Sequence, residues 1–227
     1  MPPVAAAIVE YLSTIGQVTV LDGRVGKAAS DRRRQSILDA ALERFTTVGY
    51  GPTTVAEIRQ RARVTTGSLY HYFPRGKADV AAAVHLDCLR RYQDPFLPCL
   101  DAAGGDAESG VRGAVRYHLE WIAANPWRAR FLFSERPAEV RDGLRGGLAA
   151  LNRDFFARVG EWLDRHVAAG ALRPLPAQAL YALWIGPAQQ VGRQLLDGDL
   201  RVPLDDAIDI LGDGAWRALR REQAGGT

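Results

Sequence analysis

The sequence has few of the residues on which metal, redox and catalytic sites depend. Its 227 residues include only two cysteines and four histidines. No two histidines stand four apart, the spacing at which one helix presents two ligands to a metal. A glycine-rich phosphate loop, a nucleophile elbow and a recognisable pair of carboxylates are also missing. These absences argue against an enzyme, a metal site and a bound cofactor.

Long hydrophobic runs are missing as well. No apolar stretch approaches the roughly 20 residues that span a bilayer. Residues 4–9 are apolar, but no basic cluster precedes them and no small-residue cleavage site clearly follows. We therefore expect a cytoplasmic protein without a membrane partner. In that compartment Cys88 and Cys99 are expected to be reduced core thiols, with a redox switch as the alternative.

The charge is unevenly distributed along the chain. The formal net charge is +3. Residues 31–80 hold nine Lys or Arg and five Asp or Glu, so the net charge of this segment, +4, exceeds that of the whole chain. A basic segment on a near-neutral body suggests a module for binding a polyanion, carried by a separate scaffold.

The chain reads as helices from Ser30 onward. Residues 1–29 instead carry three glycines and a β-branched run, Val18-Thr19-Val20, without a sustained helical period. We interpret them as a flexible arm or as the result of a misplaced translation start. Beyond them no strand pattern interrupts the helical signals, so the sequence predicts an all-α fold of about nine helices.

Three short helices are predicted within residues 30–76. Apolar residues mark one face of the first helix, namely Ile37, Ala41, Phe45 and Val48. Gly49 ends that helix. Thr54 and Glu57 form a capping box at the start of the second helix, and Thr65 caps the third. A tight turn between the second and third helices defines a helix-turn-helix, whose last helix enters the major groove of DNA.

The start of the third helix suits contact with DNA. Thr65, Thr66 and Ser68 carry short hydroxyls that can bond base edges, and Gly67 allows close approach of the backbone. The helix amides favour a phosphate. Three further side chains that can bond phosphates or touch a thymine methyl group are Tyr70, His71 and Tyr72. Leu69 and Phe73 should face inward against Phe45, Ile58 and Val64. The alternatives are a three-helix bundle that never meets DNA and, for Tyr70, a role in packing at the rim.

Two runs in this region resemble the signature of the TetR family of transcriptional regulators. They are GYGPTTVAEI at 49–58 and VTTGSLYHYF at 64–73. The resemblance is close over residues 31–84, and later helices resemble the family only in number, length and order. It implies a homodimeric repressor that a small molecule releases from its operator. It also implies DNA contacts at Thr54, Thr65, Thr66, Gly67, Tyr70, Tyr72 and Lys77.

The sequence departs from the family pattern at two points. Arg75 and Gly76 precede Lys77, whereas the common pattern has its lysine one residue earlier, after Phe-Pro-Ser. The phosphate contact is therefore open between Arg75 and Lys77. Arg63 also replaces the glycine usual in the turn. For Arg32–Arg34 a phosphate contact and an ordinary solvated helix start both remain open, because positive charge is disfavoured at a helix N-terminus.

Longer helices follow in the C-terminal part. Asn125 and Pro126 signal a helix start, with Asn125 as the cap. Pro137 opens a helix that reaches Ala168. Two more are expected at 176–197, kinked at Pro187, and at 203–221. By resemblance to the family, these last two helices are expected to form the dimer interface.

Aromatic residues concentrate after Val111. Apolar pockets between bundled helices commonly bind drug-sized molecules. The candidate ligand-binding residues are Tyr117, His118, Trp121, Trp127, Phe131, Phe155, Trp162 and Trp184. For each aromatic, core packing is the competing interpretation, and for His118 it is an imidazole bonded to a neighbouring backbone group. Further polar candidates are Asn152, Gln189 and Gln190.

Together these features predict three segments: an arm at 1–29, a helix-turn-helix domain at 30–76 and a helical effector-binding and dimerisation domain at 77–227. The expected partners are double-stranded, near-palindromic operator DNA, a small hydrophobic or aromatic effector, and a second copy of the chain. The alternative function is a helix-turn-helix protein that binds DNA without any effector.

Overall fold

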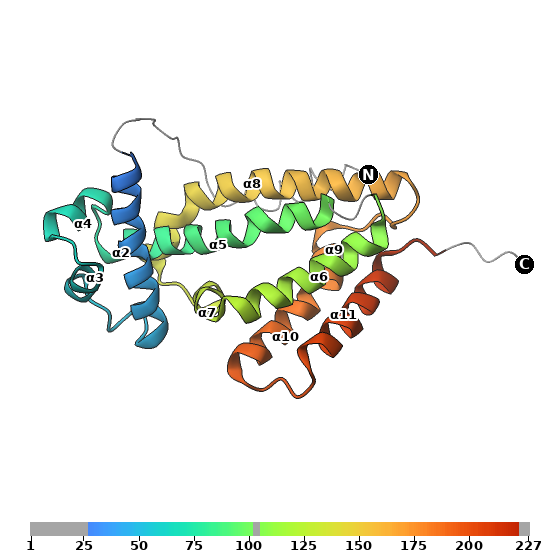
Figure 1. Ribbon diagram of the computed structural model, residues 1–227. Coiled ribbons are helices and arrows are strands. Elements are labelled where there is room, and N and C mark those ends of the chain that lie inside the picture. Colours follow the sequence, from blue (N-terminus) through green and yellow to red (C-terminus); the bar gives the residue numbers. More distant parts are fainter. Residues whose placement is uncertain (1–26, 102–104, 223–227) are drawn as a thin grey trace, which may run out of the picture. The chain divides into compact units, whose positions relative to one another are not determined.

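The computed structural model describes residues 27–101 and 105–222, which form an all-α fold (Figure 1). Ten helices lie in these residues, against about nine expected, and no strand does beyond one isolated bridge. The helices are α2 (Lys27–Thr47), α3 (Val55–Ala62), α4 (Thr66–Tyr72), α5 (Lys77–Asp101), α6 (Ala107–Ala124), α7 (Pro126–Phe133), α8 (Ala138–Ala168), α9 (Ala177–Trp184), α10 (Gly186–Asp197) and α11 (Leu204–Leu219). Residues 1–26, most of the predicted arm, lie outside the described residues.

The described residues divide into two compact units. The N-terminal unit comprises 27–90 and 127–150, and the C-terminal unit comprises 91–101, 105–126 and 151–222. Helices α5 and α8 each contribute residues to both units. The functional division expected at residue 76 stays a prediction. No helix within these residues has the length and hydropathy needed to cross a membrane.

Local signals fix the helix boundaries in the N-terminal unit. Gly49 follows α2 with a φ of +93°, a conformation that suits glycine. Thr54 and Glu57 form the predicted capping box, in which each side chain bonds the backbone N–H of the other residue. Thr65 caps α4 by accepting from the Ser68 amide at 3.1 Å. The predicted helix-turn-helix is therefore present.

The core of the N-terminal unit holds these three helices against α5, α7 and α8. Leu69 and Phe73 are buried with Phe45 and Ile58, as predicted, and Val64 packs against them. From outside the helix-turn-helix the core receives Phe131, Val140 and Leu144. Val48 was predicted to extend the buried face of α2, and that is wrong: it lies beyond the end of the helix and is 41% exposed.

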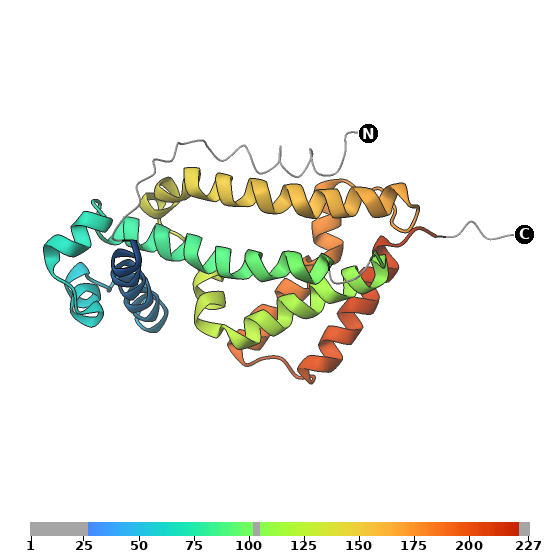
Figure 2. The same ribbon diagram turned by 45° about the horizontal axis from the view of Figure 1, so that its top comes forward.

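The C-terminal unit packs α6 against α10 and α11, as Figure 2 shows. Trp162 on α8 stacks on Trp184 of α9, with 5.9 Å between ring centroids. The helix predicted at 176–197 breaks into α9 and α10 at Ile185, and Pro187 lies in the first turn of α10. The side-chain amide of Asn125 donates to the Trp121 carbonyl at the end of α6. The capping of α7 by Asn125 stays a prediction.

Candidate functional site

Helix α4 presents a polar face to solvent. The side chains at its start are exposed at Thr65 and Thr66, and Gly67 is exposed beside them. Tyr70 is 45% exposed. His71 is exposed and Ser68 half-buried, whereas Leu69 on the opposite face is fully buried. The predicted recognition residues therefore share one accessible helix face, as entry into a DNA groove requires.

A basic hollow borders the start of α4. It measures about 600 Å³ and is lined by side chains from α2, the α3–α4 turn and α4. Its basic residues are Arg32, Arg33 and Arg63. Arg63 has a φ of +55°, the only positive φ at a non-glycine position among the described residues. The sequence indicates Arg63 only as a departure from the family pattern, whereas in the structure it lines the same hollow as Thr65 and Ser68.

Three other predicted DNA contacts also hold the N-terminal unit together. The Thr54 hydroxyl donates to Glu57 at 2.9 Å. The Tyr72 hydroxyl lies 3.0 Å from that of Ser30. Lys77 donates from its ammonium group to two backbone carbonyls of the α2–α3 loop. Any contact of these side chains with DNA would therefore start from positions already fixed by the fold.

Arg75, the other candidate for the phosphate contact, is paired within its own segment. Its guanidinium Nε lies 2.7 Å from Asp79, and its backbone N–H donates to the same carboxylate at 2.8 Å. The side chain is more than half exposed. Neither Arg75 nor Lys77 is free of a protein partner, and the choice between them stays open.

The C-terminal unit contains an aromatic cavity of about 610 Å³. Helices α5, α6, α8, α9 and α10 all contribute to its wall. The lining residues are Tyr92, Phe96, His118, Phe155, Phe156, Val159, Ala177, Gln178, Leu180, Tyr181, Trp184, Ile185 and Gln189. A volume of this size accommodates a drug-sized molecule, and the wall is mainly apolar. We call it the aromatic cavity.

His118 places a polar edge in this wall. Its Nδ1 lies 2.8 Å from the hydroxyl of Tyr92, while its Nε2 is buried without a hydrogen-bond partner. The residue is 5% exposed, and burial lowers the pKa of His118 to about 4. The imidazole is therefore neutral at physiological pH. The alternative interpretation, an imidazole bonded to a backbone group, is wrong, because the partner of the ring is the side-chain hydroxyl of Tyr92.

Three further polar residues line the cavity on α9 and α10, namely Gln178, Tyr181 and Gln189. The Tyr181 hydroxyl donates to the Oε1 atom of Gln189 at 2.8 Å. This bond leaves the Nε2 amide protons of Gln189 as donors. The other polar candidates lie elsewhere: Asn152 accepts from Gln93 at 2.9 Å, and Gln190 is not part of the cavity wall.

The structure brings His118, Phe155 and Trp184 together in the cavity but places the other candidate aromatics elsewhere. Tyr117 donates to the Tyr92 carbonyl at 2.6 Å, and Trp121 donates to the Arg91 carbonyl at 3.2 Å, so both pack on α5. Trp162 lies in the core of this unit, where its ring stacks on that of Trp184. These three residues do not line the cavity.

Trp127 and Phe131 are also outside the cavity, because they belong to the N-terminal unit. Trp127 is 50% exposed. Phe131 is buried in the core of that unit and stacks on Phe45, with 5.7 Å between ring centroids. Sequence reasoning missed Tyr92 and Phe96, although their spacing of four residues places them on one face of α5.

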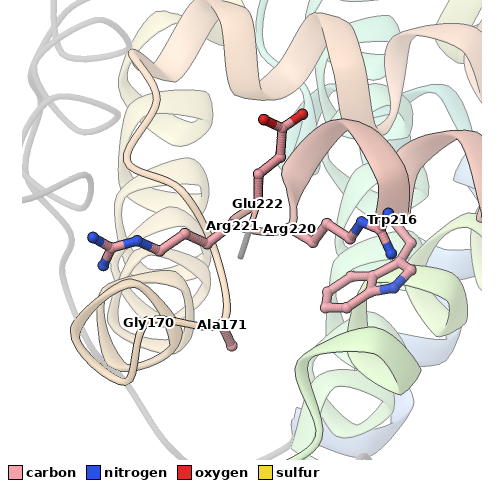
Figure 3. Close-up of a pocket in the computed structure, with 6 residues that line it drawn as sticks. All are labelled: Gly170, Ala171, Trp216, Arg220, Arg221 and Glu222. Atoms are coloured by element: carbon pink, nitrogen blue, oxygen red, sulfur yellow. The ribbon is translucent and has the colours of Figure 1, made fainter. Parts of the chain in front are cut away.

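A second hollow in the C-terminal unit lies beside the segment after α11 and is lined by residues of opposite charge (Figure 3). Figure 3 shows that its arginines diverge, Arg220 toward Trp216 and Arg221 toward Gly170. The Arg221 backbone N–H donates to the Ala171 carbonyl at 2.9 Å. This hydrogen bond joins the segment after α11 to the α8–α9 connection, and the two arginines form no convergent charged site.

The cysteines and acidic residues form no metal centre in the part of the chain that the structure describes. Cys88 is buried, as predicted for a core thiol. Cys99 is half-buried, and burial raises the pKa of its thiol. Its Sγ lies 3.4 Å from the Pro95 carbonyl.

A helix-turn-helix with a polar, exposed recognition helix defines a DNA-binding transcriptional regulator. Comparison with known proteins agrees: the family model for bacterial regulatory proteins, tetR family, matches residues 37–84. The chain is 31% identical to the transcriptional regulator AcuR of Cereibacter sphaeroides over 67% of this chain and 71% of that protein. The chain belongs to the TetR family. Members of this family bind operator DNA and are dimers.

Other similarities extend over most of the chain. The HTH-type transcriptional regulator RutR of Escherichia coli is 28% identical over 71% of this chain and 74% of its own. A crystal structure of a TetR family regulator from Marinobacter aquaeolei has the same fold. It superposes with a TM-score of 0.69 at 20% identity, covering 86% of this chain and 100% of that one.

Proposed function

We propose that this regulator is a repressor that leaves a near-palindromic operator when a small hydrophobic or aromatic molecule fills the aromatic cavity. The observation that carries the proposal is the cavity itself, an apolar space of about 610 Å³ in the unit that does not contain the helix-turn-helix. A solid helical core would have no such space, since protein interiors are normally close-packed.

The DNA end of the mechanism uses the exposed face of α4. Thr65, Thr66 and Gly67 would approach the base edges, with Ser68 beside them. Thr54, Tyr70, His71, Tyr72 and Lys77 would contact the backbone. The hydroxyls and the glycine favour this assignment because they can enter a groove about 12 Å wide without a clash. Two copies related by a two-fold axis would bind half-sites about 34–36 Å apart.

The dimer would form through the helices at 176–197 and 203–221. Exposed apolar side chains support this assignment: Leu183 on α9 is 37% exposed and Ile210 on α11 is 65% exposed. Gly214 lies one turn after Ile210 and has no atoms near the position of a Cβ, so another helix can approach closely there. Large exposed apolar residues of this kind commonly mark protein interfaces.

Coupling between the two ends would pass along α5. This helix carries Tyr92 and Phe96 of the cavity wall and, at its other end, residues 77–90 of the N-terminal unit. A ligand that binds one arrangement of the wall more tightly shifts the population toward it. If that arrangement spaces the two recognition helices poorly for one face of DNA, the affinity for the operator falls.

The test is a titration of the dimer against DNA from upstream of its own coding region, with and without a library of hydrophobic compounds. A compound that lowers operator affinity should lose its effect in Ala177→Phe, which places a ring in the cavity wall. Ala179→Phe is the matched control, because Ala179 lies on the same helix but outside that wall, and both variants are first checked to be dimers since α9 belongs to the proposed interface. Equal operator affinity with and without every bound compound would instead favour a regulator that has no effector.

A further inference from the structure

His118 has an unusual combination of burial and an unmet hydrogen bond. The residue is 5% exposed and lines the aromatic cavity, yet its Nε2 has no hydrogen-bond partner. Leaving a buried polar group unpaired is costly, so such groups usually have a partner. A ligand in the cavity would supply that partner. The kind of partner depends on whether Nε2 carries a proton.

The hydrogen bond between Tyr92 and His118 indicates which imidazole nitrogen carries the proton. Burial raises the pKa of the Tyr92 phenol, which therefore keeps its proton. The hydroxyl lies 2.8 Å from Nδ1 of His118 and has no other acceptor among the described residues, so donation to Nδ1 would satisfy both groups. If Nδ1 accepts, the single proton of a neutral imidazole must reside on Nε2. His118, which lines the cavity, would then carry a buried N–H donor without a protein partner on Nε2.

The rest of the wall also offers donors and carries no charge. The Oε1 atom of Gln189 already accepts from Tyr181, which leaves its amide protons for a ligand. None of the lining residues is Lys, Arg, Asp or Glu. An ionised ligand would therefore lose its hydration without gaining a counter-charge, which is strongly unfavourable.

We propose that the cavity takes an uncharged, mainly apolar molecule whose carbonyl-type oxygen accepts a hydrogen bond from the Nε2–H group of His118. The proposal rests on the function proposed above, since it identifies the chemistry of that same effector site. Ketones, esters and amides with an aromatic or alicyclic body have the required acceptor. Hydrocarbons lack it, and carboxylates carry the wrong charge.

The tautomer can be measured without any ligand. Long-range ¹H–¹⁵N NMR of the full chain, with His118 assigned through His118→Phe, should show Nδ1 as the unprotonated nitrogen and Nε2 as protonated at pH 7.5. Tyr92→Phe removes the hydroxyl that holds this tautomer and should move the population toward a mixture. An Nδ1-protonated ring in the unmodified protein would overturn the proposal.

Ligand preference provides the second test. The probes are benzophenone, which has a carbonyl acceptor, diphenylmethane, which has the same two rings without one, and diphenylacetate, which is charged. We expect benzophenone to bind about tenfold more tightly than diphenylmethane, with diphenylacetate weakest. His118→Phe should abolish the preference for benzophenone. His166→Phe is the matched control, because His166 is a buried histidine of the same unit outside the cavity wall.

The outcomes separate this proposal from the function on which it rests. If diphenylmethane binds as tightly as benzophenone and releases the operator, the cavity is an effector site and the proposed chemistry is wrong. If benzophenone is preferred but never changes operator affinity, the chemistry stands and the repressor mechanism falls. Preferred binding of diphenylacetate, or no binding of benzophenone, would overturn the proposal.

Discussion

The ammonium group of Lys77 lies 3.0 Å from the carbonyl oxygen of Tyr50. It lies 3.1 Å from the Gly51 carbonyl as well, and 4.4 Å from the centroid of the Tyr50 ring. These contacts join the start of α5 to the loop between α2 and α3. Lys77 was predicted to contact a phosphate. The geometry adds a structural role that substitution would also disturb.

Lys77→Ala should therefore lower stability as well as DNA affinity. Loss of the two bonds to carbonyls and of the contact with the ring should reduce the free energy of unfolding by about 1 kcal/mol. Arg75→Ala is the control, because its exposed pair with Asp79 should contribute less than about 0.5 kcal/mol. Denaturant unfolding of both variants measures the difference. Equal stability of the two would show that Lys77 does not fasten the loop.

Arg63→Gly should separate fold stability from DNA binding. Arg63 adopts a φ of +55°, which costs a non-glycine residue roughly 1 kcal/mol and which glycine tolerates. The variant should be as stable as the parent or up to about 1 kcal/mol more stable. If the guanidinium contacts a phosphate, the slope of log affinity against log salt should become shallower by about one. Arg63→Lys, which keeps the charge, should preserve that slope, and an unchanged slope in Arg63→Gly would remove Arg63 from the DNA contacts.

The helix-turn-helix could be predicted from the sequence because its signals are local. The capping box of Thr54 and Glu57 spans four residues, and Gly49 ends α2 through its own backbone conformation. The inward positions of Leu69 and Phe73 follow from their spacing on one short helix. Each of these features depends on neighbours in the chain, which a sequence displays directly.

The cavity could not be predicted in the same way. Tyr117 and Trp121 are aromatic and share a helix face with each other, yet both bond carbonyls of α5 and fill space there. His118, between them in sequence, faces the cavity. A cavity is the volume that the side chains of several helices leave unfilled, so it depends on contacts between residues far apart in the chain. Helical periodicity gives the faces of a helix but not the partner of each face.

Gly110→Ala should be strongly destabilising, whereas Gly113→Ala on the same helix should stabilise. A Cβ at Gly110 would lie 2.2 Å from a ring carbon of Trp162, and that ring stacks on Trp184 and cannot easily yield. Overpacking of this kind costs about 1–3 kcal/mol. At Gly113 a Cβ meets no atom within 4 Å, so the helix gains up to about 1 kcal/mol from alanine. Thermal unfolding would measure both, and a tolerated Gly110→Ala would contradict the close packing of Trp162.

Stability should fall as the pH is lowered from about 6.5 toward 4. Burial lowers the pKa of His118 to about 4, and burial together with the charge of Arg136 lowers the pKa of His85 to about 3. Between the unfolded and folded pKa values the unfolded chain binds more protons, so acid favours unfolding. Each histidine contributes at most about 1.4 kcal/mol per pH unit.

Denaturant unfolding across this pH range tests the sign. His118→Phe and His85→Phe should each flatten the dependence, because each removes one group that must take up a proton on unfolding. A stability that rises toward pH 4, or an unchanged slope in both variants, would contradict the buried neutral state of these rings.

Ile210→Glu should convert the dimer to monomers. Ile210 is 65% exposed in the single chain, and a two-fold contact through α11 would bring two such side chains to one interface. Two buried carboxylates without partners should raise the dissociation constant of the dimer by more than about tenfold. Analytical ultracentrifugation measures this change. Val48→Glu, at an exposed apolar residue of the N-terminal unit, should leave the dimer intact.

Because two linked recognition helices bind a palindrome more tightly than one, Ile210→Glu should weaken binding to the full operator and leave binding to an isolated half-site unchanged. A dimer that persists in Ile210→Glu would place the interface on another face.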